Sequence, residues 1–260
     1  MRYNFPHCSE QLERHQLHTI NVTGTYNVRD LGGYRTTTGS QTKGHMMLRS
    51  GNLDKIPISS QKQLIDYGIR TVIDIRDEWE AENYPNVFVD SSQINYLNLP
   101  LIGDRLSNDV RWRSETENYV HLHELYIHYL EHCQIQIANI FTAIVQSKIA
   151  TLFHCHAGKD RTGLMTALLL SAVGVANHDI AMDYSLSSQQ IPHLIHEWRQ
   201  YAIKHGQDME QFDRKVASKP ETMLEMLNFI QNQYDNTVTY LHSCGISNTI
   251  VEQIQERFLE

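Results

Sequence analysis

The stretch Leu152-Phe153-His154-Cys155-His156-Ala157-Gly158-Lys159-Asp160-Arg161-Thr162-Gly163 decides the expected fold. The apolar run 149–153 leads into it and predicts a buried strand, and the apolar run 164–175 follows it and predicts a buried helix. The turn between them holds a cysteine, a lysine, an aspartate and an arginine. A strand, a tight loop and a helix N-terminus form a ready anion site, because backbone N–H groups and the positive end of the helix dipole converge there.

Two residues of this turn carry the expected chemistry. Cys155 stands at its start, where the local field stabilises the thiolate, the reactive form of cysteine. Arg161 follows six residues later, and its planar guanidinium can bind two phosphate oxygens at once. The alternative is a buried cysteine ahead of an ordinary helix. The length of the motif favours the anion site over that alternative.

The spacing Cys-x5-Arg, framed by His154 and by Thr162-Gly163, resembles the phosphate-binding loop of the cysteine-dependent phosphatases. The fuller string His-Cys-x-Ala-Gly-Lys-Asp-Arg-Thr-Gly resembles the bacterial tyrosine and lipid phosphatase branch of that superfamily. The resemblance runs from about residue 24 to residue 256. The other segments that keep the family's order are 26–34, 46–53, 74–80, 183–184 and, in the closing part, 230–234, 240–241 and 245–247.

The expected architecture is a single α/β phosphatase domain over residues 1–260, with three layers. A central, mostly parallel sheet of four or five strands carries the Cys-x5-Arg loop at a strand C-terminus, with helices on both faces. The N-terminal segment adds antiparallel strands, and residues 105–115 are polar and expected to be mobile. Residues 188–219 are amphipathic, and they are either a helical lid over the site, as in some family members, or a plain surface helix. The remaining strands and helices are expected at 46–53, 59–67, 71–76, 93–101, 117–146 with a break near Cys133, 177–185, and from Pro220 onward.

Composition excludes several classes. The net charge of −8 argues against nucleic-acid binding. The four cysteines form no zinc spacing, and no stretch approaches the roughly 18 apolar residues of a membrane span, so no integral membrane segment is expected. The N-terminus, residues 1–16, shows no signal-like apolar region. Cytoplasmic residence is therefore the expectation, with export lacking a recognisable signal left open, and the oligomeric state is not indicated.

Four of the fifteen histidines fall in one segment, which raises the question of a metal site. No HExxH motif is present there, so an exposed polar face of an amphipathic helix is favoured. No metal and no cofactor are expected, because the cysteine mechanism requires none. The four histidines are His121, His123, His128 and His132.

The residues of the turn fit hydrolysis of a phosphate monoester. Cys155 is the candidate nucleophile and would form a cysteinyl-phosphate intermediate. The amides of residues 156–161 and the Arg161 guanidinium would hold the equatorial oxygens. His154 would orient the loop, and Thr162 would hydrogen-bond the sulfur. The phosphate-binding set is therefore His156, Ala157, Gly158, Lys159, Asp160 and Arg161.

The general acid has two candidates of equal standing. Asp104 follows a predicted strand beyond Pro100 and beside Gly103, where many cysteine-dependent phosphatases carry a mobile acid loop. Asp160 lies in the phosphate loop itself, as is typical of this bacterial branch, where a phosphate dianion would favour its protonated form. Asp77 and Asp109 are weaker candidates.

The resemblance implies a phosphorylated protein or phosphoinositide as substrate. Phosphotyrosine is the chief expectation, with phosphoserine, phosphothreonine and phosphoinositides as further ones, because Lys159 adds a positive charge of the kind that accompanies lipid phosphatase activity. The alternative function is a catalytically silent module that binds phosphate or phosphoproteins. Arg29 and Asp30 are expected to brace the sheet near the loop, and Asp74 and Arg76 to form a structural pair.

Overall fold

The computed structural model describes residues 18–117, 119–147 and 149–260, so the predictions for residues 1–17, Cys8 included, lie outside the described part. A five-stranded sheet forms its centre, with one antiparallel pair, β1 with β2, and three parallel pairs. This confirms the predicted mostly parallel α/β sheet. In spatial order the strands are β1 (Arg29–Asp30), β2 (Met47–Ser50), β5 (Ala150–His154), β3 (Ile69–Asp74) and β4 (Asn95–Asn98).

The register of the sheet places the site. His154, the last residue of β5, pairs with Ser50 of β2 on one side and with Asp74 of β3 on the other. The carboxyl ends of the three central strands therefore meet at one edge, directly before Cys155. Ligand sites of parallel sheets form at such edges.

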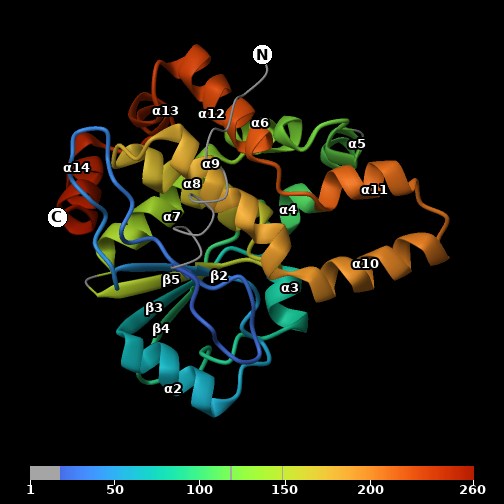
Figure 1. Ribbon diagram of the computed structural model, residues 1–260, viewed down its shortest axis with the longest axis horizontal. Helices are drawn as coiled ribbons and strands as arrows, with labels where there is room; N and C mark the ends of the chain where they lie inside the picture. The colour runs from blue at the N-terminus through green and yellow to red at the C-terminus, as the bar shows by residue number, and fades with distance from the viewer. Residues whose placement is uncertain (1–17, 118, 148) are drawn as a thin grey trace.

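Side chains alternate across the sheet and bury both of its faces. Ile73 and Phe153 join the large apolar cluster of one face, while Val72 and Leu152 join the smaller cluster of the other. Helix α2 (Ile58–Tyr67) covers the smaller face, and most of the other helices cover the larger one (Figure 1). The three-layer arrangement is thus the consequence of strands that are apolar on both sides.

Outside the sheet and α2, the described chain is mainly helical. In chain order its helices are α3 (Glu78–Asn83), α4 (Asp104–Ser107), α5 (Val110–Glu117), α6 (Leu122–His132), α7 (Gln134–Gln146), α8 (Asp160–Ala172), α9 (Asn177–Ser185), the 3-10 turn η1 (Leu186–Gln190), α10 (Pro192–Lys204), α11 (Met209–Val216), α12 (Pro220–Tyr234), α13 (Thr237–Ser243) and α14 (Asn248–Phe258). No helix of the described part is long and apolar enough to span a bilayer.

Residues 105–115, expected to be a polar mobile stretch, fall largely within the short helices α4 and α5. Trp112 explains the difference, because its side chain is buried and stacks on Tyr129 of α6 with ring centroids 5.9 Å apart. The strand expected over 93–101 is shorter than predicted and covers only Asn95–Asn98. The break near Cys133, which separates α6 from α7, is where it was expected.

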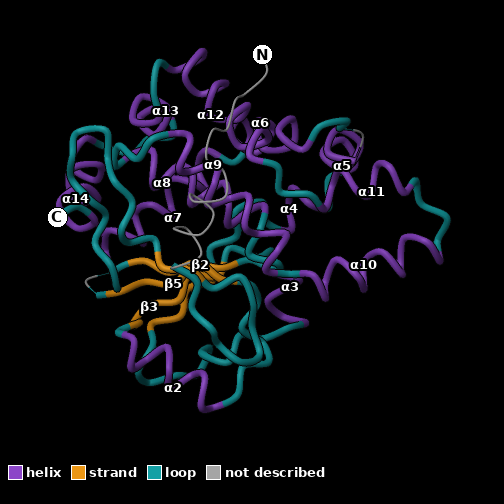
Figure 2. The backbone as a smooth tube through the Cα atoms, viewed as in Figure 1, coloured by secondary structure: helices purple, strands orange, loops and turns teal. Residues whose placement is uncertain are grey.

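Helices α10 and α11 form a hairpin that projects from the body of the molecule (Figure 2). Arg199 of α10 pairs with Asp213 of α11, and its guanidinium lies 5.2 Å from the centre of the Phe212 ring. The hairpin thus has its own internal contacts. Its root is buried, because Ile191 and Leu194 pack against Ala157 of the phosphate loop.

Candidate active site

The phosphate loop, residues 155–161, is held from outside by its carbonyl groups. Asn27 Nδ2 donates to the carbonyls of Ala157 at 3.2 Å and of Gly158 at 2.7 Å. Arg49 Nη2 also donates to the Gly158 carbonyl, at 2.6 Å. The carbonyl of His156, the residue before Ala157, accepts from the backbone N–H of Asn52 at 2.9 Å. With the carbonyls engaged outward, the loop amides are left for an anion on the concave side.

Gly158 is required by the geometry of this loop. Its φ is +66°, and a Cβ there would lie 2.5 Å from the carbonyl oxygen of Ser50. The end of β2 therefore lies directly against the loop at Gly158. A side chain at this position would force the loop away from the sheet edge.

A buried charge cluster fixes the two arginines that flank the loop. Asp183 of α9 accepts from Arg29 Nε at 2.9 Å and from Arg49 Nη1 at 2.5 Å, and all three side chains are shielded from solvent. Burial opposes ionisation of Asp183, but the two guanidinium groups outweigh it and hold its pKa well below the usual range. Arg29 also donates to the Asn27 carboxamide, so the cluster reaches the loop through that side chain.

Arg29 and Asp30 were predicted to brace the sheet near the loop, and Arg29 does so by joining β1 to Asp183 and Asn27. The Asp30 carboxylate accepts from the backbone N–H groups of Gly32 at 2.8 Å and His45 at 2.7 Å. It therefore stabilises the turns beyond β1. Asp74 and Arg76 do form a buried pair, with Nη2 and Oδ2 2.5 Å apart.

His154 lies under the loop and is completely buried. Its Nδ1 is 3.1 Å from the Cys155 carbonyl, and its Nε2 is 2.9 Å from Nδ2 of Asn86. Burial lowers the pKa of His154, against the opposing effect of Asp74. A neutral ring that donates from Nδ1 and accepts at Nε2 satisfies both contacts, so the histidine can orient the carbonyl of the cysteine.

Cys155 is 3% exposed and follows β5 directly. The hydroxyl of Thr162 is buried in the first turn of α8 and has no hydrogen-bond partner among the described residues. An unpaired buried hydroxyl is uncommon in a folded protein. It is in keeping with the expectation that Thr162 serves the sulfur during the reaction.

Arg161 is oriented by two carboxylates that follow β3. Its Nη2 donates to Glu80 Oε1 at 2.9 Å, its Nη1 also pairs with Glu80, and Nη1 lies 3.6 Å from Asp77 Oδ1. Burial disfavours the charged form of Arg161, but these carboxylates outweigh that effect and raise its pKa above the usual value. Glu80 is one of the site residues that sequence reasoning missed, with Asn27, Arg49, Asp183 and Tyr126. The signal for Glu80 was the Asp-x-x-Glu capping box of α3, which sets both carboxylates beside the loop.

Lys159 does not face open space. Its side chain is 1% exposed, and Nζ donates to Asp160 Oδ1 at 2.8 Å and to the carbonyl of Lys215 at 2.9 Å. Asp160, the first residue of α8, is 37% exposed and also accepts from the Tyr126 hydroxyl at 2.6 Å. The loop lysine thus ties the loop to the end of α11.

Asp160 and Arg161 share a cavity of about 480 Å³. Its remaining walls are mostly aromatic and aliphatic and come from α6, the residues before it, and the hairpin. The described lining residues are Asp77, Glu80, Ile102, Tyr119, Leu122, Leu125, Tyr129, Asp160, Arg161, Trp198, Phe212, Lys215 and Val216. The Arg161 guanidinium, held by Glu80 at one end, and the apolar wall suit a phosphate ester of an apolar or aromatic alcohol.

Asp104 is not among those lining residues. Both of its carboxylate oxygens lie 3.1 Å from the backbone N–H of Trp79, and its own N–H donates to Glu78 Oε2 at 2.7 Å. The carboxylate therefore binds the N-terminal turn of α3. The structure brings Asp160, and not Asp104, into the cavity of Arg161.

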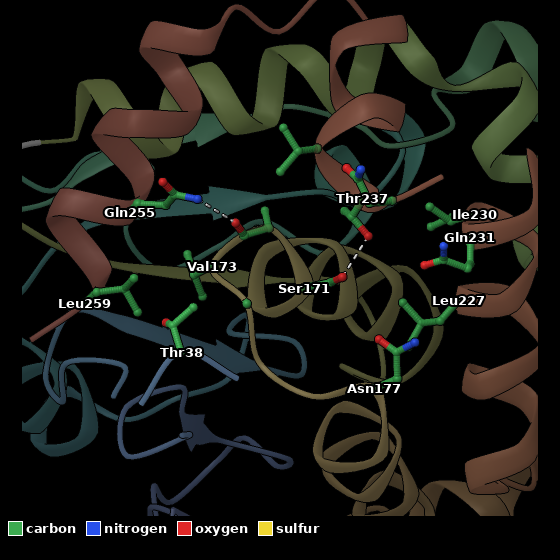
Figure 3. Close-up of a pocket in the computed structure, with 14 residues that line it drawn as sticks. Thr38, Ser171, Val173, Asn177, Leu227, Ile230, Gln231, Thr237, Gln255 and Leu259 are labelled. Carbon is green, nitrogen blue, oxygen red and sulfur yellow. Dashed lines mark hydrogen bonds between the residues drawn. The ribbon is translucent and has the colours of Figure 1, made fainter. Parts of the chain in front are cut away.

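A second cavity, of about 400 Å³, lies at the other end of α8 (Figure 3). Ser171 bonds Thr237 across it at 2.7 Å, and Gln255 donates to the Ala172 carbonyl at 3.1 Å. The described residues that line it include no charged group and no cysteine. It is separate from the chemistry of the phosphate loop.

No three His, Cys, Asp or Glu side chains of the described ranges gather to hold a metal ion. In the histidine-rich segment, His128 and His132 stack on each other with ring centroids 4.2 Å apart, and His128 packs on Trp112 at 4.5 Å. Packing against aromatic rings therefore explains the positions of two of the four histidines, His128 and His132.

Comparison with known proteins identifies the family. The model of the tyrosine phosphatase family matches residues 20–260. The chain is 26% identical over 219 residues to a tyrosine-protein phosphatase of Nostoc commune, covering 81% of this chain and 73% of that one. It is 31% identical over 169 residues to a putative tyrosine-protein phosphatase of Cupriavidus necator (63% and 61% covered). It is 24% identical over 271 residues to a triple specificity protein phosphatase of Mycobacterium tuberculosis (90% and 96% covered).

With a cysteine at the sheet edge, an arginine held beside it and a family match over nearly all of the described chain, the protein belongs to the tyrosine phosphatase family and is a cysteine-dependent protein-tyrosine phosphatase.

Proposed function

We propose that this phosphatase works through a cysteinyl-phosphate intermediate, with Cys155 as nucleophile and Asp160 as the proton donor. The observation that carries the proposal is the shared cavity of Asp160 and Arg161 at the N-terminus of α8, one loop away from Cys155. The outward binding of the loop carbonyls supports it, because it leaves the amides of residues 156–161 to hold a phosphoryl group.

In the first step, the Cys155 thiolate attacks phosphorus, and the sulfur–phosphorus bond forms as the ester bond breaks. The leaving oxygen takes the proton of Asp160, while Arg161 and the amides stabilise the equatorial oxygens. In the second step, water attacks phosphorus and gives its proton to the Asp160 carboxylate. The sulfur leaves as a thiolate, assisted by the hydroxyl of Thr162.

Asp160 is preferred to the other carboxylates because of where it lies. Asp104 is engaged by α3. Asp77 lines the cavity, and burial raises its pKa against the effect of Arg161, which would suit a donor. However, its side chain accepts from the backbone of α3 and from the N–H of Gly103 at 3.2 Å. The Asp160 side chain is also more solvent-exposed than that of Asp77, 37% against 14%.

The aromatic walls of the cavity favour phosphotyrosine as the leading substrate, since an aryl group packs well on Tyr129, Trp198 and Phe212. A second class, phosphoinositides, is favoured by Lys215, which lines the same cavity and adds a positive charge. Lys159 supports that class less directly, because its ammonium group is buried under α11. Phosphoserine and phosphothreonine have smaller leaving groups and would leave the apolar wall unfilled.

The hairpin of α10 and α11 would serve as the lid of this site. Ile191 and Leu194 lie on Ala157, and Trp198 lies 6.4 Å from His156, measured between ring centres. A bulky phosphoprotein would reach the loop only after α10 moves away. Lys159 would hold the closed form through the carbonyl of Lys215.

The first experiment is hydrolysis of p-nitrophenyl phosphate in the presence of EDTA, with the wild type and Cys155→Ser. Turnover by the reduced wild type and none by the variant is the expected result. A folded wild type that binds vanadate but turns over no substrate would instead support the silent binding module. A panel of phosphotyrosine, phosphoserine and phosphoinositide substrates then ranks the substrate classes.

A further inference from the structure

Tyr126 of α6 makes a contact with the site for which the mechanism above has no use. Its hydroxyl donates to Asp160 Oδ1 at 2.6 Å, and Lys159 Nζ donates to the same oxygen at 2.8 Å. Among the described residues, these are the two groups that hydrogen-bond the Asp160 carboxylate. Both select one oxygen and leave the other.

We infer that Tyr126 is a positioning residue that fixes Oδ2 of Asp160 as the oxygen that carries and delivers the proton. A carboxylate oxygen has two lone pairs in the plane of the group, and both of those on Oδ1 are engaged by donors. A proton added to Asp160 therefore resides on Oδ2. The inference rests on the proposed role of Asp160 as the acid.

The direction of the tyrosine hydrogen bond is set by its neighbours. Tyr126 is completely buried, and burial raises its pKa well above the usual value, so the phenol keeps its proton. A phenol has one proton, and an ionised carboxylate can only accept. Tyr126 therefore donates to Asp160, and Tyr184, whose hydroxyl is 2.7 Å away, donates to Tyr126.

The two rings hold this chain of hydrogen bonds in place. The rings of Tyr126 and Tyr184 lie edge to face, with an interplanar angle of 90° and centroids 6.0 Å apart. They come from two separate helices, α6 and α9. A donor fixed from two helices can set the rotation of an acid side chain that is itself partly exposed.

The other polar groups that face Asp160 do not select an oxygen. Arg161 is turned to the carboxylates of α3, and Lys215 lies over the ring of Tyr119 with Nζ 5.1 Å from its centre. Tyr119 and Tyr129 line the cavity beside Asp160. The pairing of Tyr126 with Oδ1 is thus specific to one tyrosine of several nearby.

A residue that positions a proton donor has a characteristic kinetic signature. A leaving group that is stable as an anion, such as p-nitrophenolate, needs little protonation. Phenolate or an alkoxide needs more, so a misplaced acid slows those substrates more strongly. General structural damage lowers the turnover of both substrates by the same factor.

The test compares kcat/KM, which reports the first step in which the leaving group departs, for p-nitrophenyl phosphate and phenyl phosphate in Tyr126→Phe, Asp160→Asn and a matched control. The control is Tyr240→Phe, which removes the hydroxyl of another buried tyrosine. That hydroxyl donates to the Leu130 carbonyl of the same helix at 2.8 Å. Tyr126→Phe should lower kcat/KM about tenfold for phenyl phosphate and about twofold for p-nitrophenyl phosphate, a fraction of the full effect of an acid. Tyr240→Phe should change both by one factor.

Each outcome decides a different statement. If Asp160→Asn lowers both substrates equally, the acid is another group and the proposed role of Asp160 is wrong. If Asp160→Asn separates the substrates but Tyr126→Phe behaves as Tyr240→Phe does, the positioning inference alone is overturned. Tyr184→Phe should also slow phenyl phosphate more than p-nitrophenyl phosphate, but by a smaller factor than Tyr126→Phe. If Tyr126→Phe does not fold, Tyr184→Phe takes its place in the test.

Discussion

The two sides of the phosphate loop are built in opposite ways. On the sheet side, Asn27, Arg49 and Asp183 hold the loop through buried, charge-assisted hydrogen bonds. On the hairpin side, Ile191 and Leu194 make a few apolar contacts with the loop, and one hydrogen bond joins Lys159 to the Lys215 carbonyl. Groups further out on α10 are exposed, such as Tyr201 at 60% exposure. One side is made rigid, and the other is joined lightly.

The difference shows how the fold divides two tasks. An anion cradle must be organised before substrate arrives, because reorganising dipoles during the reaction would raise the barrier. A cover must move, so it is drawn from the least stable part of the structure. The following predictions test that division, beginning with the rigid side.

The largest effect is expected from Asp183→Asn. The substitution leaves Arg29 and Arg49 buried without their counter-charge, which costs about 3–5 kcal/mol of unfolding free energy. Because the folded pKa of Asp183 is lowered, its stabilisation is present above the ordinary value of 3.8 and is lost only as pH falls through the lowered folded value. Urea unfolding at neutral and at acidic pH measures both. An unchanged urea midpoint would contradict the view that this buried charge cluster makes the sheet side of the loop rigid.

A smaller effect is expected from Asn27→Gly. Asn27 has a φ of +59°, which glycine tolerates, so the substitution removes the carboxamide without straining the backbone. The Ala157 carbonyl loses its donor and the Gly158 carbonyl keeps only Arg49, at a cost of about 1–3 kcal/mol. Vanadate affinity and kcat should both fall. Equal stability with full activity would show that the loop is held without this residue.

The third prediction concerns the arginine that faces the cavity. Glu80→Gln weakens the orientation of Arg161, and kcat should fall about tenfold, the value of one charge-assisted hydrogen bond. Burial opposes ionisation of Glu80, but Arg161 holds its pKa below 4.5. The pair therefore stabilises the fold above that value, and its contribution disappears as pH falls through the folded pKa. A pH series of kcat and of melting temperature measures both effects.

The smallest effect is expected on the hairpin side. Arg199→Gln breaks the partly exposed pair with Asp213, which contributes at most about 1 kcal/mol. The melting temperature should hardly move, while hydrogen exchange of α10 and α11 should quicken. A large loss of overall stability would mean that the hairpin is part of the core.

The local sequence pattern was enough to predict the strand, loop and helix at the centre of the fold. The features that it did not predict depend on contacts between segments far apart in the chain. The strand, the loop and α8 were predictable because both apolar runs lie next to the motif in the sequence. The helices at 104–117 were not, because the burial of Trp112 depends on α6. Likewise, nothing in the sequence around Tyr126 indicates a site role, because its hydroxyl reaches Asp160 only through the packing of α6 beside the start of α8. The burial of Lys159 depends in the same way on α11.

The bracing of the loop also has a consequence for how the chain is made. Asn27 and Arg49 come early in the chain, Cys155 near its middle and Asp183 later, with 154 positions between Arg29 and its aspartate partner. During synthesis the nucleophile therefore emerges before the residue that completes its cradle. On the proposed mechanism, the cradle of Cys155 would be complete only once α9 has docked, so an unfinished chain would carry the cysteine before its activity.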